Sequence, residues 1–105
     1  MKEILPKLPE TEKFDLIDQL RRSCKAVPRL IAEGYAKRHQ RAGFQKYLDD
    51  AMAECNETIV GLEQSRDIYA LNDELIEELV DQYDKTGRQL YNLSVSWSKF
   101  KTRQT

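Results

Sequence analysis

The two residues with the clearest chemical potential are glutamates one helical turn apart. Glu54 and Glu57 are three positions apart, so a helix places both carboxylates on one face. Metal sites in helical bundles combine such glutamates with Glu-x-x-His pairs, and the chain's one histidine, His39, lies in a basic polar run instead. We therefore expect no metal site.

The remaining nucleophiles lack an activating partner. No serine can be matched with a histidine in a triad pattern, and Cys24 and Cys55 have neither a CxxC nor a metal-binding spacing. We expect both cysteines to be small core residues. The glycines are isolated, so no phosphate-cradling loop is expected: Gly34, Gly43, Gly61 and Gly87. These patterns predict a non-enzymatic protein without a cofactor.

A row of basic residues offers binding chemistry instead. Residues 21–46 hold eight lysines and arginines and one acid, whereas residues 47–84 hold twelve acids and one arginine, giving net charges of +7 and −11. At 100° per residue, the first four basic residues share one helix face, about 40° to 140° from Ile17. Such a face can bind successive phosphates. The candidate nucleic-acid-binding residues are Arg21, Arg22, Lys25, Arg29, Lys37, Arg38 and Arg41.

The same charges have a second interpretation. The overall net charge is only −1, which is not typical of a nucleic-acid-binding protein. The basic face can instead pair with the acidic helices of the same or a neighbouring subunit, in a structural or protein-interaction module. The basic run is flanked by Tyr35, Phe44 and Tyr47. These aromatic residues could stack on bases or pack in the core, and core packing is favoured for Phe44.

Three long helices are expected to position these residues. Apolar spacings of three and four predict helices over about 11–36, 42–69 and 73–101. Pro28 predicts a kink, Asn72 an N-cap, and Thr86-Gly87 a bend or a close helix contact. The expected buried stripes are Ile17, Leu20, Cys24, Val27 and Ile31 in the first helix, Phe44, Leu48, Ala51, Cys55, Ile59 and Leu62 in the second, and Ile76, Leu79, Tyr83, Leu90, Leu93, Trp97 and Phe100 in the third.

The expected fold is all-α, an antiparallel up-and-down four-helix bundle in one domain over residues 1–105. Its first helix is reduced to a stub, because Pro6 and Pro9 bracket the connection after Leu5. The groove left open must then be filled by another subunit, a partner or residues outside this sequence. No segment has the apolar length of a membrane span and the N-terminus lacks a secretory signal, so we expect a cytoplasmic protein without a membrane partner.

Residues 19–34 read Gln-Leu-Arg-Arg-Ser-Cys-Lys-Ala-Val-Pro-Arg-Leu-Ile-Ala-Glu-Gly. This segment resembles the signature of bacterial four-helix-bundle proteins encoded by intervening sequences in 23S ribosomal RNA genes, roughly Q-L-R-R-A-A-x-S-I-P-x-N-I-A-E-G. The resemblance covers nearly the whole chain, with Phe44-x-x-x-Leu48-x-x-Ala51 and Glu57 at family positions. The departures are Ser23 and Cys24 for two alanines, Leu30 for an asparagine, Ala53-Glu54 for Gly-Ser, and the added charges of Lys25 and Arg29.

The resemblance implies a four-helix bundle, often a pentameric ring of identical subunits, with no known catalysis. A related branch, the accessory protein of diversity-generating retroelements, binds RNA and a reverse transcriptase through basic surfaces. The implied partners are therefore a second copy, RNA, and an RNA-processing or reverse-transcriptase protein. The family usually begins with a full helix ending in an element like Leu8-Pro9, so we expect the chain to lack most of that helix.

Overall fold

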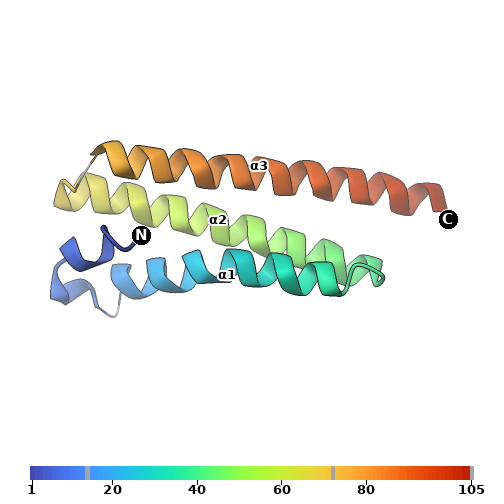
Figure 1. The fold of residues 1–105 in the computed structure, drawn as a ribbon, viewed down its shortest axis with the longest axis horizontal. Helices are drawn as coiled ribbons and strands as arrows, with labels where there is room; N and C mark the ends of the chain where they lie inside the picture. The colour runs from blue at the N-terminus through green and yellow to red at the C-terminus, as the bar shows by residue number, and fades with distance from the viewer. Residues whose placement is uncertain (14, 72, 105) are drawn as a thin grey trace.

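Three long antiparallel helices make up most of the protein (Figure 1). The computed structural model describes residues 1–13, 15–71 and 73–104, without the side chains of Arg41 and residues 98–104. Two 3-10 turns, η1 (Leu5–Lys7) and η2 (Glu10–Glu12), precede α1 (Leu16–Ala36), α2 (Arg41–Tyr69) and α3 (Asp73–Gln104). The described residues contain no strand, which confirms the all-α class. Asn72, the predicted N-cap, and the side chain of Phe100 lie outside this description.

The central helix is α2, and α1 and α3 flank it (Figure 1). Within the described ranges, the backbones of α1 and α3 each contact α2 but not each other. The result is an elongated arrangement of 52 × 23 × 16 Å with a radius of gyration of 15.8 Å, compared with about 13 Å for a compact domain of this length. None of the described helices is both long and apolar enough to cross a membrane.

The first helix begins at Leu16 rather than near Thr11. The backbone at Asp15 is not helical, with φ −126° and ψ −99°, and the residues before it form the turn η2. One carboxylate oxygen of Glu12 accepts the Leu16 N–H at 3.2 Å, and the other accepts the Tyr69 hydroxyl. This turn therefore caps α1 and ties it to the end of α2, in place of the helical turn that the spacing predicts.

The buried stripe of α1 is rotated from the predicted one. Leu20 and Val27 are buried, but Ile31 is 37% exposed and Cys24 is only half-buried. The prediction of a core position is therefore wrong for Cys24 and confirmed for Cys55. In place of Cys24 and Ile31, the buried face of α1 includes small residues, which allow another helix to approach closely. This face consists of Leu16, Leu20, Ser23, Ala26, Val27, Leu30 and Gly34. The helix continues through Pro28.

Two glycines allow α1 and α2 to approach closely. A Cβ atom on Gly61 would lie 2.6 Å from Leu20 Cδ2, and one on Gly34 would lie 2.8 Å from Tyr47 Cβ. At Gly87 the nearest contact of an added Cβ would be an ordinary 4.0 Å, so this glycine is not required for a close helix contact. The α1–α2 contact therefore depends on two glycines that the spacing did not single out.

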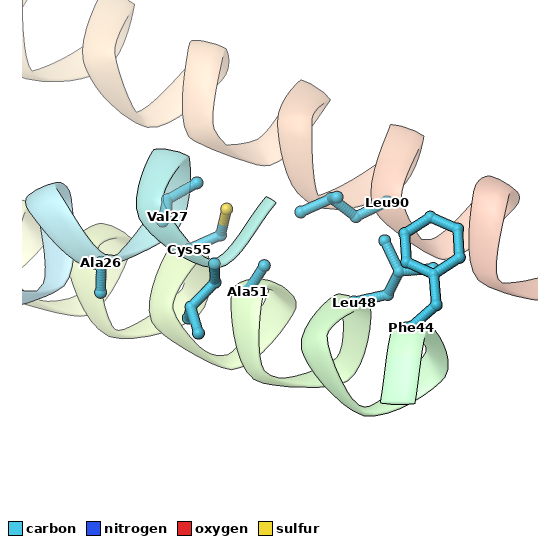
Figure 2. Close-up of a cluster of buried hydrophobic side chains, with 8 residues drawn as sticks. Ala26, Val27, Phe44, Leu48, Ala51, Cys55 and Leu90 are labelled. Carbon is cyan, nitrogen blue, oxygen red and sulfur yellow. The ribbon is translucent and has the colours of Figure 1, made fainter. Parts of the chain in front are cut away.

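Two apolar clusters fill the interior. One joins α1, α2 and α3 around Val27, Leu48 and Leu90 (Figure 2). The other joins the N-terminal turns to the long helices and consists of Ile4, Leu8, Leu16, Leu20, Leu62 and Ile76. Tyr83 packs against both clusters. The stub therefore covers part of the three-helix core, with the Ile4 side chain fully buried.

The protein is expected to lose stability at alkaline pH because of Cys55 and Tyr83. Burial, and then the charge of Glu54, raise the pKa of the Cys55 thiol above its ordinary 9.0. Burial, and then the two nearby thiols, raise the pKa of Tyr83 above its ordinary 10.0. Above about pH 9 the unfolded chain binds fewer protons than the folded one, so the free energy of unfolding falls as pH rises.

Urea titrations at about pH 8 and about pH 10.5 measure this effect. The double variant Cys55→Ala/Tyr83→Phe should start at lower stability, because a buried thiol is removed, but lose less on going to high pH. Equal losses in the variant and the unmodified protein would contradict the assignment to these two groups.

Candidate nucleic-acid interface

The predicted basic face lies on the exposed side of α1. Arg21, Arg22, Lys25 and Arg29 are all exposed. At 100° per residue they lie about 140° to 240° around the helix from Leu16, which packs in the core. These four side chains therefore lie outside the core and are accessible to a large ligand.

The other three predicted residues lie at the end of this helix. Lys37 and Arg38 are exposed in the short connection between α1 and α2. Arg41 is the first residue of α2, and its side chain lies outside the described part of the structure. The fold thus places the basic residues along one helix face and at the adjoining turn.

Acidic neighbours neutralise two of the four residues on the helix face. Arg22 Nε lies 3.0 Å from Asp18 Oδ2, and Arg29 Nη1 lies 3.8 Å from Glu33 Oε1. Both pairs have the i,i+4 spacing of helix ion pairs. Within the described residues, Arg21 and Lys25 form no ion pair. Arg21 and Lys25 are therefore the cations of α1 most available to a phosphate.

The two glutamates considered for metal binding lie beside the paired arginines. Glu54 and Glu57 share with Arg22, Lys25 and Arg29 a hollow of about 360 Å³ between α1 and α2, although Lys25 forms no ion pair with either glutamate. Burial and the charge of Glu57 raise the pKa of the Glu54 carboxyl, and the two arginines partly oppose this shift. In the part of the chain that the structure describes, no three His, Cys, Asp or Glu residues gather as metal ligands.

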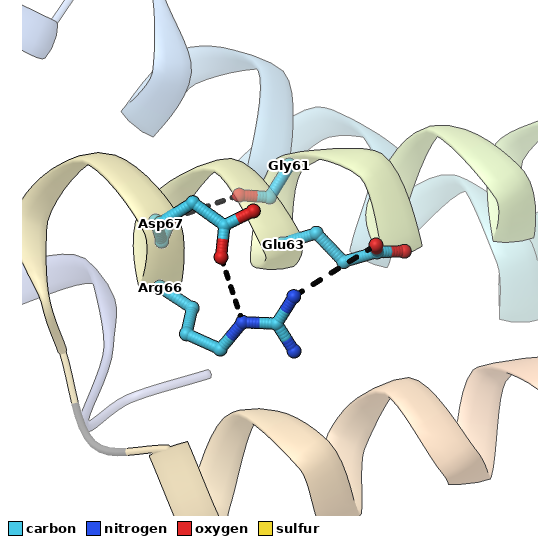
Figure 3. Close-up of polar contacts among 5 residues, drawn as sticks. Gly61, Glu63, Arg66 and Asp67 are labelled. Carbon is cyan, nitrogen blue, oxygen red and sulfur yellow. Dashed lines mark hydrogen bonds and ion pairs between the residues drawn. The ribbon is translucent and has the colours of Figure 1, made fainter.

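The acidic half of the sequence lies on α2 and α3. Arg66 is the one base among residues 47–84, and its guanidinium pairs with Asp67 at 2.9 Å and with Glu63 at 4.0 Å (Figure 3). The hydrogen bond and charge of Asp67 raise the pKa of Arg66. Most of the acids are exposed. The backbones of α1 and α3 do not contact each other in the described ranges, so the acids of α3 lie apart from the basic face of α1, whereas Glu54 and Glu57 of α2 lie beside it.

Comparison with known proteins relates the chain to a family. The family model of the 23S rRNA-intervening sequence protein matches residues 1–92. The chain belongs to this family. The resemblance seen in residues 19–34 is thereby confirmed. Searches of curated proteins and of solved structures gave no match.

The signature segment of the intervening-sequence family contains both packing and surface residues. Leu20 and Gly34 are buried against α2, whereas Arg21 is exposed without an ion pair among the described residues. Ser23 stands where the signature has an alanine, and its hydroxyl is buried. This hydroxyl is hydrogen-bonded to that of Thr58 at 2.8 Å, so the added polar group has a partner. The segment therefore joins the α1–α2 contact to the exposed basic face.

Sequence reasoning left base stacking open for Tyr35 and missed a second feature. Tyr35 is 60% exposed beside Arg38, whereas Phe44 is buried in the core, as its pattern favours. A hollow of about 390 Å³ lies between α2 and α3, lined by Met52, Ile59 and Tyr91, where Gly87 has no side chain. Thr86-Gly87 predicts a bend or a close helix contact, and the structure instead has a hollow beside Gly87.

Proposed function

We propose that this family member is a non-enzymatic cytoplasmic protein that contacts RNA through the basic face of α1. The observation that carries the proposal is the pair Arg21 and Lys25, exposed and without an ion pair among the described residues. Lys37 and Arg38 continue this positive surface at the end of the helix. Two observations support a non-enzymatic role. The one histidine, His39, is exposed on the surface, and Glu54 and Glu57 lie beside arginines rather than beside a nucleophile.

Binding through this face is electrostatic and depends on salt. Each lysine or arginine that neutralises a phosphate releases a condensed counterion, which favours association at low salt and carries no sequence preference. Arg22 and Arg29 must leave an acidic partner to do this, so their contribution is smaller than that of Arg21 and Lys25. The proposal therefore separates the seven candidate residues into stronger and weaker contributors.

Filter binding of RNA across a salt series tests the proposal. The variant Arg21→Gln/Lys25→Gln is expected to bind more weakly and to reduce the slope of log affinity against log salt by about 2, one for each lost phosphate contact. Its matched control is Asp18→Asn/Arg22→Gln, which removes an exposed ion pair and leaves the net charge unchanged. The control should change the slope and the affinity much less than Arg21→Gln/Lys25→Gln does, because the removed arginine is already paired with Asp18.

Equal RNA retention by Arg21→Gln/Lys25→Gln and by the unmodified protein would overturn the proposal. Circular dichroism and urea unfolding of both variants check the fold, and exposed charges of this kind change stability by about 0–1 kcal/mol.

The proposal includes self-association. The described helices leave apolar side chains exposed, including Ile31 at 37%, Leu93 at 43% and Tyr91 at 60%. A homo-oligomer in which the three long helices become part of a four-helix bundle would cover such surface, and a pentameric ring is the form that the family resemblance implies. Light scattering of the unmodified protein measures the subunit number.

A second candidate function is supported by the exposed acids of α2 and of the first part of α3, which are opposite in charge to the basic face of α1. The basic face of one copy can pair with the acidic helices of the next, in a structural module, or dock on a reverse transcriptase or RNA-processing protein. Under the structural alternative, Arg21→Gln/Lys25→Gln dissociates the oligomer, seen as a lower mass by light scattering. A reading frame inside a ribosomal RNA gene, or beside a reverse-transcriptase gene, distinguishes the two family branches.

A further inference from the structure

An exposed aromatic ring and an arginine are stacked at the end of α1. The guanidinium carbon of Arg38 lies 4.0 Å from the centroid of the Tyr35 ring. Arg38 Nη1 also donates a hydrogen bond of 2.9 Å to the Tyr35 carbonyl oxygen, which holds the guanidinium in place. Tyr35 is 60% exposed, so the stacked pair is accessible from solvent.

The packing of the preceding residue directs this ring outward. Gly34 is buried against Phe44 and Tyr47 of α2, so close that an added Cβ would lie 2.8 Å from Tyr47 Cβ. Successive residues of a helix point 100° apart, so Tyr35 leaves that contact and projects to the surface. The exposure of the ring is therefore built into the α1–α2 contact.

A second cation lies beside an aromatic ring at the same turn. Lys37 Nζ is 5.5 Å from the centroid of the Tyr47 ring and donates to its hydroxyl at 3.4 Å. Within the described ranges, neither Lys37 nor Arg38 forms an ion pair. The turn thus combines stacking surface with positive charge that no described acid neutralises.

We propose that Tyr35 and Arg38 form a stacking site for an unpaired RNA base, with Lys37 beside it for the adjoining phosphate. This inference rests on the proposed RNA contact and adds the class of RNA that is preferred. Aromatic rings and guanidinium planes stack on bases that are splayed out, whereas the bases of an RNA duplex are stacked on one another and inaccessible. The site therefore favours single strands and loops, and the charges on the helix face bind both forms.

Fluorescence anisotropy with two labelled RNAs tests the preference. One probe is an oligouridylate of about 12 nucleotides, and the other is an RNA duplex of the same length. The variant Tyr35→Ala is expected to weaken binding of the single strand by about 5- to 150-fold, as for one lost base stack, and to leave duplex binding and the salt slope unchanged. Tyr35→Phe keeps a ring and should keep the affinity.

The outcomes separate this inference from the proposed function. If Tyr35→Ala binds the single strand as the unmodified protein does, the stacking site is wrong while the phosphate contacts of α1 stand. If the unmodified protein binds neither probe, both proposals fail. An equal loss for both probes also overturns the stacking site, because it indicates a general effect on the surface. Thermal unfolding of Tyr35→Ala should match that of the unmodified protein, since the ring is mostly exposed.

Discussion

Replacing Gly61 with leucine is expected to destabilise the fold by about 3 kcal/mol, a large share of the ~5–15 kcal/mol that stabilises a domain of this size. A Cβ atom at this position would lie 2.6 Å from Leu20 Cδ2 and 3.0 Å from Leu20 Cγ, and the Leu20 side chain is fully buried. The clash is relieved only if the buried Leu20 side chain leaves its position or α1 moves away from α2, and either change disturbs the core between the helices. Urea unfolding followed by circular dichroism measures the loss.

The matched comparison uses alanine at two glycines inside helices. Gly61→Ala gains about 1 kcal/mol of helix propensity but loses more to overpacking against Leu20. Gly87→Ala has the same gain without the clash, because its Cβ would meet Cys55 Cβ at 4.0 Å, and should raise stability by about 0.5–1 kcal/mol. A Gly61→Leu variant that unfolds at the same urea concentration as the unmodified protein would contradict the close α1–α2 contact.

Replacing Phe44 with alanine is expected to cost about 3–5 kcal/mol, the range for a buried phenylalanine. Phe44 is 6% exposed and packs in the core cluster shared by the three long helices. Its ring meets that of Trp97 edge to face, with the centroids 4.7 Å apart and an angle of 83° between the planes. Removal of the ring therefore leaves a cavity and also uncovers one side of the indole.

The chain's single tryptophan gives this prediction a local measurement. Emission of Trp97 in folded Phe44→Ala should shift to longer wavelength as water reaches the indole, in addition to the lower urea midpoint. Phe44→Leu keeps most of the apolar volume and should cost about 1–1.5 kcal/mol with a smaller shift. An unchanged emission maximum in Phe44→Ala would show that Phe44 does not shield Trp97.

Hydrophobic spacing predicted the helices better than it predicted their rotation. It places the starts of α2 and α3 within one residue of those observed, because Leu48, Leu62 and Ile76 form regular stripes. It is also wrong at Leu93 of α3, which is 43% exposed, and it failed in α1, where Ser23 and Gly34 occupy the contact with α2 and a count of apolar residues gives them no weight. Close approach of two helices selects small residues, and only the structure shows which helix faces meet.

The sequence predicted which residues form the candidate site, but not which of them are paired with acids. Net charge identifies the basic segment. It does not show that some of these basic residues form ion pairs with acids one helical turn away, which reduces their availability to a phosphate. Asp18 lies just outside the counted segment, so Arg22 was grouped with Arg21 although one is paired and the other has no ion pair among the described residues. The stack of Arg38 on Tyr35 depends on the geometry of the turn, which spacing along a helix does not describe.

The absence of backbone contact between α1 and α3 in the described ranges has a consequence for how the chain folds. Helices adjacent in sequence are the ones that pack together, so the long-helix contacts form by closing the short connections that follow α1 and α2. A low mean sequence separation of contacts is associated with fast folding. The hairpin of α1 and α2, with its glycine contacts, can therefore pack first, and α3 can then join it along the other side of α2.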